Sequence, residues 1–428
     1  MRHLPITSQL FSRNRENLCQ RLPNRALAIV HANDILPTNA DGTLPLHPNS
    51  DLFYLSGIEQ EESILVLFPS ASDPKHREIL FVKKSNDHLR IWEGYKHSQA
   101  DAQKISGIQT IFWTEDFGNI LQLLAAEADI FYLNNNEHSR ACNKVDTRDK
   151  RWNKKVRKDY PLHQIRRLAP HLHTLRFCKS PDEIKLIKQA IDVTTQGFNK
   201  VLRMVKPGIK EYEIEAEWAK EFIKRRCKFA YTPIVASGEN SCVLHYLQND
   251  QTCKKGQLLL MDVGACYANY NADLSRTIPV SGKFTRRQKQ VYNSVLRVLR
   301  QSIENATVGK SLKEWQSDSH DMMNEEMLRL KLCTKADLTQ KNSDQPICRQ
   351  FFMHGLGHSL GLDVHDVSNG QDRFVENAVF TVEPGIYLPK EGFGIRLEDN
   401  IQITPNGPVN LMSKVAIEAA EIEEIMNR

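Results

Sequence analysis

Four carboxylates interrupt strand-like apolar segments in the carboxy-terminal half of the chain, and they strongly limit what it can fold into. Asp262 ends the run LLLMD and Asp273 follows 11 residues later, while Glu383 lies in TVEPGIY and Glu398 in GIRLEDN. Burial of an unpaired charge is very costly. One such residue alone would more often form a salt bridge or face solvent. Four of them indicate a shared partner of opposite charge, such as a metal ion.

The residues around Asp262 and Asp273 predict a hairpin, because two apolar runs, 257–264 and 270–279, are joined by a turn. In this hairpin Asp273 would face Asp262 from the returning strand, where opposed carboxylates repel each other. A cation between them would remove the repulsion. Further strands are expected over 379–386 and 394–403, where a period of two places Glu383 and Glu398 on defined faces.

Three of the fifteen histidines, His354, His358 and His365, fall in the segment FFMHGLGHSLGLDVHD. The spacing of the first two is that of the zinc-binding motif HExxH, but Gly355 stands where that motif needs its general-base glutamate. Residues 357–361 match the nucleophile elbow GxSxG. However, the one histidine downstream of Ser359 is too close in sequence to come from the separate loop of such a hydrolase. Metal binding together with the carboxylates is therefore the better interpretation.

The ordered set of Asp in MDVGA, Asp in ADLSRT, His in HGLGHSLGLDVHD, Glu in TVEPGIY and Glu in IRLEDN resembles the pita-bread metallopeptidases of the aminopeptidase P and prolidase type. Upstream, NSDLFYLSGI and ILVLFP resemble the amino-terminal domain of aminopeptidase P. The resemblance implies an α+β architecture. A mixed α/β domain of the creatinase and aminopeptidase P amino-terminal type would span residues 1–171, and a pita-bread catalytic domain residues 172–428.

The same resemblance implies roles for individual residues. Five would be metal ligands: Asp262, Asp273, His358, Glu383 and Glu398. Asp273 and Glu398 would bridge two ions, and Glu383 would also transfer protons. His245 and His365 would contact the substrate. Three further residues that match motif positions would support the site: His354, Tyr387 and Arg396.

Four carboxylates and one imidazole form an oxygen-rich donor set that suits Mn²⁺, Co²⁺, Fe²⁺ or Zn²⁺. Four negative charges match two divalent cations, and the resemblance implies two Mn²⁺ ions per subunit. Such ions would convert a bridging water to the hydroxide that cleaves the bond between an N-terminal residue and a following proline. Prolidase, restricted to Xaa-Pro dipeptides, is the alternative, and a non-catalytic pita-bread binding module is the remote one.

The remaining features favour a soluble two-domain enzyme. The 428 residues include nine cysteines without a CxxC pair, and they contain neither a run of roughly 18 apolar residues nor an amino-terminal secretory signal. We therefore expect a cytoplasmic protein without membrane contact, and the resemblance implies that it acts on peptides with proline in second position. The resemblance implies a homodimer or homotetramer.

The net charge of +5 is local, because residues 148–167 hold nine Lys or Arg and only two Asp. No aromatic stacking pattern accompanies them, so a solvated linker or helix face fits better than a nucleic-acid site. We expect this segment at the junction of the two domains. Downstream, Ser180 with Glu183 predicts the start of a helix by a capping box, and Thr285 and Ser311 begin similar ones.

Overall fold

The chain forms two compact units in a computed structural model that describes residues 3–141, 144–339 and 347–428. The first unit comprises His3–Arg176 and the second Phe177–Arg428. Helix α7 (Ala169–Phe177) ends at this division. The boundary expected after residue 171 lies within that helix.

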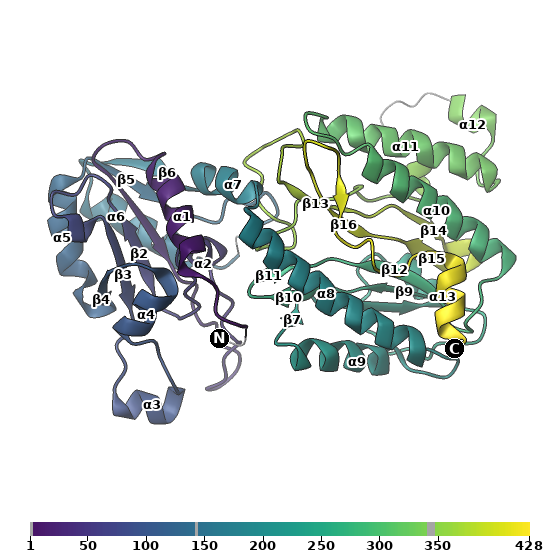
Figure 1. The fold of residues 1–428 in the computed structure, drawn as a ribbon, viewed down its shortest axis with the longest axis horizontal. Helices are drawn as coiled ribbons and strands as arrows, with labels where there is room; N and C mark the ends of the chain where they lie inside the picture. The colour runs from purple at the N-terminus through teal and green to yellow at the C-terminus, as the bar shows by residue number, and fades with distance from the viewer. Residues whose placement is uncertain (1–2, 142–143, 340–346) are drawn as a thin grey trace. The chain divides into compact units, whose positions relative to one another are not determined.

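A six-stranded mixed sheet forms the centre of the first unit (Figure 1). Its order is β4-β3-β2-β1-β5-β6; β2 runs antiparallel to β1 and β3, and the other three pairs are parallel. The strands are β1 (Ala26–His31), β2 (Ile64–Leu67), β3 (Glu78–Val82), β4 (Thr110–Trp113), β5 (Ile130–Leu133) and β6 (Gln164–Arg167). The first three confirm the strands that the short apolar runs 26–30, 63–68 and 79–82 predict from the sequence alone.

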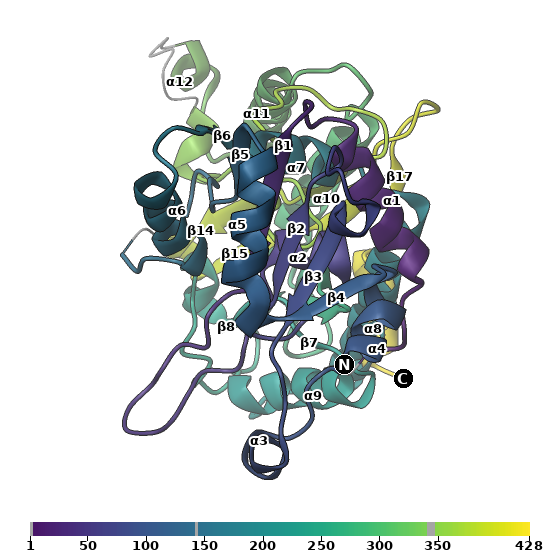
Figure 2. The same cartoon turned by 90° about the vertical axis from the view of Figure 1, so that its left-hand side faces the viewer.

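Helices cover this sheet and complete its core. They are α1 (Ser8–Cys19), α2 (Ser50–Ser56), α4 (Gln99–Ser106), α5 (Phe117–Glu127) and α6 (Arg148–Asp159). A further helix, α3 (Asp87–Glu93), buries no residue and lies apart from the sheet (Figure 1). Leu124 of α5 belongs to the same buried cluster as Phe81 and Phe131 of the strands. Figure 2 shows α5 in front of the strands of this unit.

The basic segment belongs to the first unit, so its predicted place at the domain junction is wrong. Strand β6 is parallel to β5, and a parallel neighbour requires a crossover connection, which α6 supplies. The fully buried Val156 holds α6 against the core. The expected solvated helix face is also present, because Arg148 and Arg151 of α6 pair with Asp34 near the surface.

Two pairs of helices flank the strands of the second unit (Figure 1), with α8 against α9 and α10 against α11. The helices are α8 (Pro181–Met204), α9 (Glu211–Lys224), α10 (Arg286–Glu304), α11 (Leu312–Arg329), α12 (Lys335–Thr339) and α13 (Ala419–Met426). The predicted capping boxes at Ser180, Thr285 and Ser311 are all present. None of the helices in the described ranges is long and apolar enough to cross a membrane.

The strands of the second unit form four small sheets, ordered β11-β10-β7, β12-β9-β8, β13-β16-β17 and β14-β15. Before the histidine-rich segment come β7 (Lys228–Phe229), β8 (Ile234–Ser237), β9 (Leu258–Asp262), β10 (Ala265–Tyr267), β11 (Tyr270–Asn271) and β12 (Ser275–Pro279). After it come β13 (Val379–Val382), β14 (Gly385–Leu388), β15 (Phe393–Arg396), β16 (Asp399–Gln402) and β17 (Val409–Asn410).

The predicted hairpin around the two aspartates exists, but its register differs from the prediction. Asp262 ends β9 and lies opposite Ser275 of β12, so Asp273 is not its cross-strand neighbour. Asp273 instead lies between β11 and β12. The turn at the tip joins β10 and β11, and its residues Ala268 and Asn269 have left-handed backbone angles.

The two later strands are also interrupted, each at a candidate ligand. Glu383 follows β13, and Glu398 lies between β15 and β16. Strand β13 pairs with β16, whereas β14 pairs with β15. Pro384, which has no N–H to donate to a ladder, lies at the change of partner. The predicted alternation of faces therefore stops at the two glutamates, which lie outside the strands.

Candidate active site

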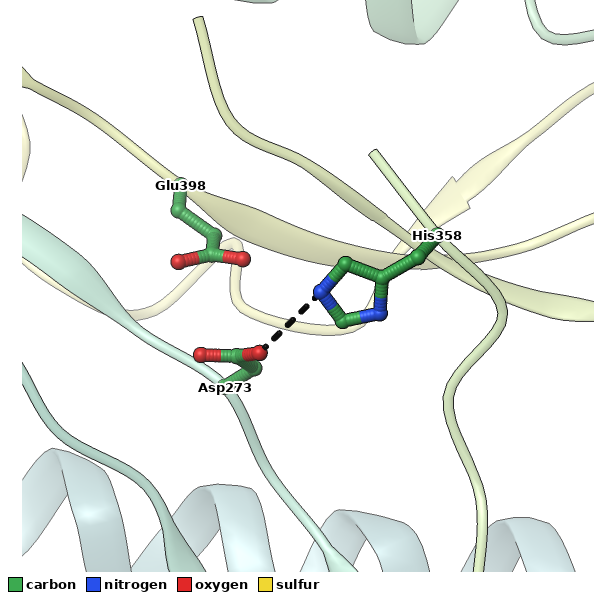
Figure 3. Close-up of side chains that lie close together, drawn as sticks. All are labelled: Asp273, His358 and Glu398. Atoms are coloured by element: carbon green, nitrogen blue, oxygen red, sulfur yellow. Dashed lines mark ion pairs between the residues drawn. The ribbon is translucent and has the colours of Figure 1, made fainter. Parts of the chain in front are cut away.

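Side chains from separate segments of the second unit come together in Figure 3. Asp273, His358 and Glu398 each offer one ligand atom, and these atoms lie within 4.8 Å of one another. His358 Nε2 is 3.5 Å from Asp273 Oδ2 and 3.7 Å from Glu383 Oε1. Four of the five expected ligands are thus connected directly.

Tyr231 connects the fifth expected ligand, Asp262, with the others. Its hydroxyl contacts carboxylate oxygens of both Asp262 and Asp273. Burial, and then the charges of these two aspartates, raise the pKa of Tyr231 well above its usual range. A hydroxyl has one proton to donate, so one of the carboxylates needs another positive partner. The sequence prediction missed Tyr231, because a single tyrosine ahead of a strand has no distinctive pattern. We call the following residues the ligand cluster: Asp262, Asp273, His358, Glu383 and Glu398.

Backbone contacts fix the strand breaks from which the ligands project. The N–H of Glu398 donates to the carbonyl of Ser275 at 3.0 Å, and the N–H of Glu383 to the carbonyl of Leu356 at 2.7 Å. In the hairpin, a Cβ on Gly264 would lie 1.8 Å from the backbone carbonyl oxygen of Ala272. Only glycine permits so close an approach of two backbones.

The ligand cluster carries more negative than positive charge. Burial, and then the nearby Asp273, raise the pKa of Glu398 well above its usual range. Burial likewise raises the pKa of Glu383 to about 7 and that of Asp262 despite its contact with Arg396. Within the described ranges, the four carboxylates contact one guanidinium and one ligand imidazole. Divalent cations would balance this excess, and carboxylate with imidazole suits them, so the residues fit a metal site.

The three residues expected to support the site form a hydrogen-bonded chain behind Asp262. Arg396 donates from Nη2 to Asp262 Oδ2 at 2.7 Å, from Nη1 to Tyr387 Oη at 2.8 Å and from Nε to Ser275 Oγ at 2.8 Å. Tyr387 Oη lies 2.8 Å from His354 Nε2. Burial, and then the charge of Arg396, lower the pKa of His354 to about 3. His354 is therefore neutral, and the chain holds one oxygen of Asp262 in place.

The two histidines expected to contact substrate are both exposed. The imidazole of His365 stacks on that of His358, with ring centroids 3.8 Å apart and an interplanar angle of 23°. His245 follows the short helix η3 (Gly238–Cys242). Its charge is among the causes that lower the pKa of His354, so it lies within electrostatic reach of the site. Both positions leave the side chains open to a ligand.

We expect the Glu383→Gln variant to stabilise the metal-free protein above pH 7. A carboxyl whose pKa is about 7 when folded and about 4.3 when unfolded binds more protons in the folded state between these values. Its contribution to stability therefore falls as the pH rises through that window. Glutamine has no such penalty, so the variant should gain about 1–3 kcal/mol at pH 8 and nothing at pH 4.

Thermal unfolding in the presence of a chelator at both pH values measures this difference. The exposed Glu376→Gln is the matched control and should leave stability unchanged at either pH. A metal-free Glu383→Gln protein that is no more stable than the wild type at pH 8 would contradict the expectation.

Known proteins with similar sequences and folds match nearly the whole chain. Residues 185–405 match metallopeptidase family M24, and residues 11–132 match the aminopeptidase P, N-terminal domain family. The Xaa-Pro aminopeptidase of Escherichia coli strain K12 is 33% identical over 98% of this chain and 98% of its own length. A Bacillus anthracis structure assigned to aminopeptidase P has a TM-score of 0.91 at 33% identity, with 99% of both chains covered. Zinc-substituted E. coli aminopeptidase P in complex with product has a TM-score of 0.86 at 31% identity, with the same coverage.

These matches agree with the architecture described above. The α+β arrangement expected from the sequence, an aminopeptidase P amino-terminal domain followed by a pita-bread metallopeptidase domain, is confirmed. The candidate ligand group lies in the part of the chain that matches the metallopeptidases. The chain therefore belongs to metallopeptidase family M24 and, within it, to the aminopeptidase P type.

Proposed function

We propose that this protein is an Xaa-Pro aminopeptidase that uses two divalent metal ions to hydrolyse the bond between an N-terminal residue and a following proline. The observation that supports it most is the ligand cluster itself, in which two buried carboxylates, Asp273 and Glu398, and two half-buried ones, Asp262 and Glu383, outnumber the cationic groups that contact them. The Xaa-Pro aminopeptidases to which the chain is similar over nearly its full length supply the substrate class.

In this proposal Asp262 would help to hold one ion, His358 and Glu383 the other, and Asp273 and Glu398 both. The oxygen-rich donors suit Mn²⁺, Co²⁺, Zn²⁺ or Fe²⁺, and we propose Mn²⁺ because the family resemblance favours it. When bound, such ions lower the pKa of water and polarise a carbonyl oxygen. Arg396, which Tyr387 and His354 hold in place, fixes one oxygen of Asp262 and opposes the rise of its pKa.

The remaining steps are assigned to Glu383, which is also a ligand, and to two histidines outside the ligand cluster. Glu383 would take up a proton from the attacking water and pass it to the leaving prolyl nitrogen, which is a general acid–base role that a carboxylate can fill. His365, stacked on His358, donates a hydrogen bond to the oxygen on which negative charge develops. His245 contacts the substrate from the exposed segment after η3.

Preference for proline has a physical basis. The Xaa-Pro bond has no N–H, and the pyrrolidine ring fixes φ, so capture of the peptide as an added strand is unavailable. A shaped pocket has to replace it. Peptides with proline in second position are thus the proposed substrates. No nucleic-acid or membrane partner is proposed.

Hydrolysis of Arg-Pro-Pro beside an Xaa-Pro dipeptide, by metal-stripped protein resupplied with Mn²⁺, tests the proposal. We expect Mn²⁺-dependent release of arginine from the tripeptide and little activity after metal removal. Cleavage of the dipeptide alone would assign the protein to prolidase. Absence of metal-dependent cleavage of either peptide would favour a non-catalytic binding module.

Three further properties belong to the proposal. The eight cysteines in the described ranges are free thiols, which supports a reducing compartment such as the cytoplasm. The functional domains are proposed as residues 1–171 and 172–428. The assembly is proposed as a homodimer or homotetramer, which light scattering of the purified protein measures.

A further inference from the structure

A buried ion pair outside the ligand cluster lies against the segment that carries His365. Lys179 Nζ is 3.0 Å from Asp366 Oδ2, and both side chains are only 1% exposed. Removal of either partner is expected to destabilise the fold, because it would leave the other charge buried and unpaired. The backbone N–H of Lys179 also donates to the carbonyl of Asn377 at 2.9 Å, so the lysine is fixed at both ends.

The segment 359–366 is a closed loop. The N–H of Asp366 donates to the carbonyl of Ser359 at 2.8 Å, and Asn271 Nδ2 donates to the carbonyls of Gly361 and Leu362 at 3.0 and 2.9 Å. A Cβ on Gly361 would lie 2.2 Å from Asp366 Oδ2 and 2.9 Å from the Cε of the lysine partner. The ion pair therefore packs directly on the loop backbone and leaves no room for the loop to shift toward it.

His365 depends on this arrangement, because it directly precedes the buried Asp366 while its own side chain is exposed. Its ring nevertheless stacks on that of His358 at 3.8 Å. The backbone that Asp366 anchors thus sets where the exposed imidazole lies relative to the ligand cluster.

We propose that Lys179 is a positioning residue, which holds His365 over the ligand cluster by anchoring Asp366. The inference rests on the proposed function, in which His365 contacts the oxygen that gains charge. A catalytic group displaced by about 1 Å can lose on the order of 10²-fold in rate. Lys179 itself does not contact the reacting atoms.

A mutant cycle separates positioning from general support of the fold. Lys179→Met is made in the wild type and in the His365→Ala background, and kcat and KM are measured for Arg-Pro-Pro with Mn²⁺. We expect kcat to fall about 10- to 100-fold in the wild type, with KM changed less than about 3-fold, and to fall less than about 2-fold in the His365→Ala background. An equal loss in both backgrounds would overturn the inference.

An NMR measurement tests the inference independently of the catalytic activity. In Zn²⁺-loaded protein, the ring signals of His365 are assigned in histidine NMR spectra by their loss in His365→Ala. We expect Lys179→Met to move them while those of His245 stay in place; unmoved His365 signals would overturn the inference. A wild type inactive on every Xaa-Pro peptide would instead refute the proposed function, and the NMR result would still decide the role of Lys179.

Two further variants guard against a folding defect. Lys179→Gln combined with Asp366→Asn keeps a hydrogen-bonded contact without burying a lone charge, and we expect it to return kcat to within about 3-fold of the wild type. A folded double variant that stays as slow as Lys179→Met would contradict positioning through this contact. Arg176→Met breaks the buried pair with Asp51 in the first unit and is the matched control. We expect this variant to have a lower thermal stability than the wild type and an unchanged kcat.

Discussion

The Asp273→Ala variant is expected to lose Mn²⁺-dependent hydrolysis of Arg-Pro-Pro by at least about 10³-fold. Asp273 lies at the centre of the ligand cluster, 3.5 Å from His358 Nε2 and in contact with Tyr231. Its side chain also belongs to the group of ligand atoms within 4.8 Å. Asp273 thus contacts or lies close to several members of the cluster, so its removal should cost both metal affinity and rate.

The structure separates this loss from a loss of folding. Asp273 adds to the repulsion that raises the pKa values of Asp262, Glu383 and Glu398. Its removal should therefore leave the metal-free protein as stable as the wild type, or more so. Metal content after dialysis measures the metal affinity, and unfolding in the presence of a chelator measures the stability of the metal-free protein. The ratio kcat/KM measures the loss of activity. Asp321→Ala, on the exposed side of α11, is the control; an Asp273→Ala protein that keeps a tenth of the activity would refute the metal site.

A second large effect is expected from Gly357→Ala, within the histidine-rich segment. A Cβ there would lie 2.1 Å from the backbone carbonyl oxygen of Thr381 and 3.1 Å from a ring carbon of Trp315. The N–H of His358 donates to Thr381 Oγ1 at 3.0 Å, and the N–H of Thr381 to the carbonyl of His358 at 2.9 Å. The clash is with backbone that these bonds lock, so we expect about 3 kcal/mol or more of destabilisation.

Because the same shift displaces His358, Mn²⁺ affinity should fall together with stability. Gly355→Ala is the matched control in the same motif, since its nearest contact would be Gln316 Oε1 at 3.8 Å. We expect it to change stability by less than about 0.5 kcal/mol. Urea unfolding of both variants, with and without Mn²⁺, makes the comparison; equal stability of the two would show that the backbones do not approach as described.

Several features of this protein could be predicted from the sequence because they depend on short stretches of chain. The capping boxes at Ser180, Thr285 and Ser311 are each made within four residues, and all three begin helices. Strands β1, β2 and β3 follow from local apolar runs. The candidate ligands stood out because an acidic residue in an apolar run is costly to bury. The ordered motifs around them were enough to indicate the family.

Only the tertiary structure decided how these residues meet. Periodicity placed Asp273 opposite Asp262, whereas the register puts Ser275 there and joins the two aspartates through Tyr231. It also treated the segments with Glu383 and Glu398 as unbroken strands, although each breaks at its glutamate. Such features depend on pairings between distant parts of the chain, as does the contact of Lys179 with Asp366. A local sequence pattern indicates on which face of a strand a side chain lies. The pairing of distant strands in the folded protein determines which residues lie next to that side chain.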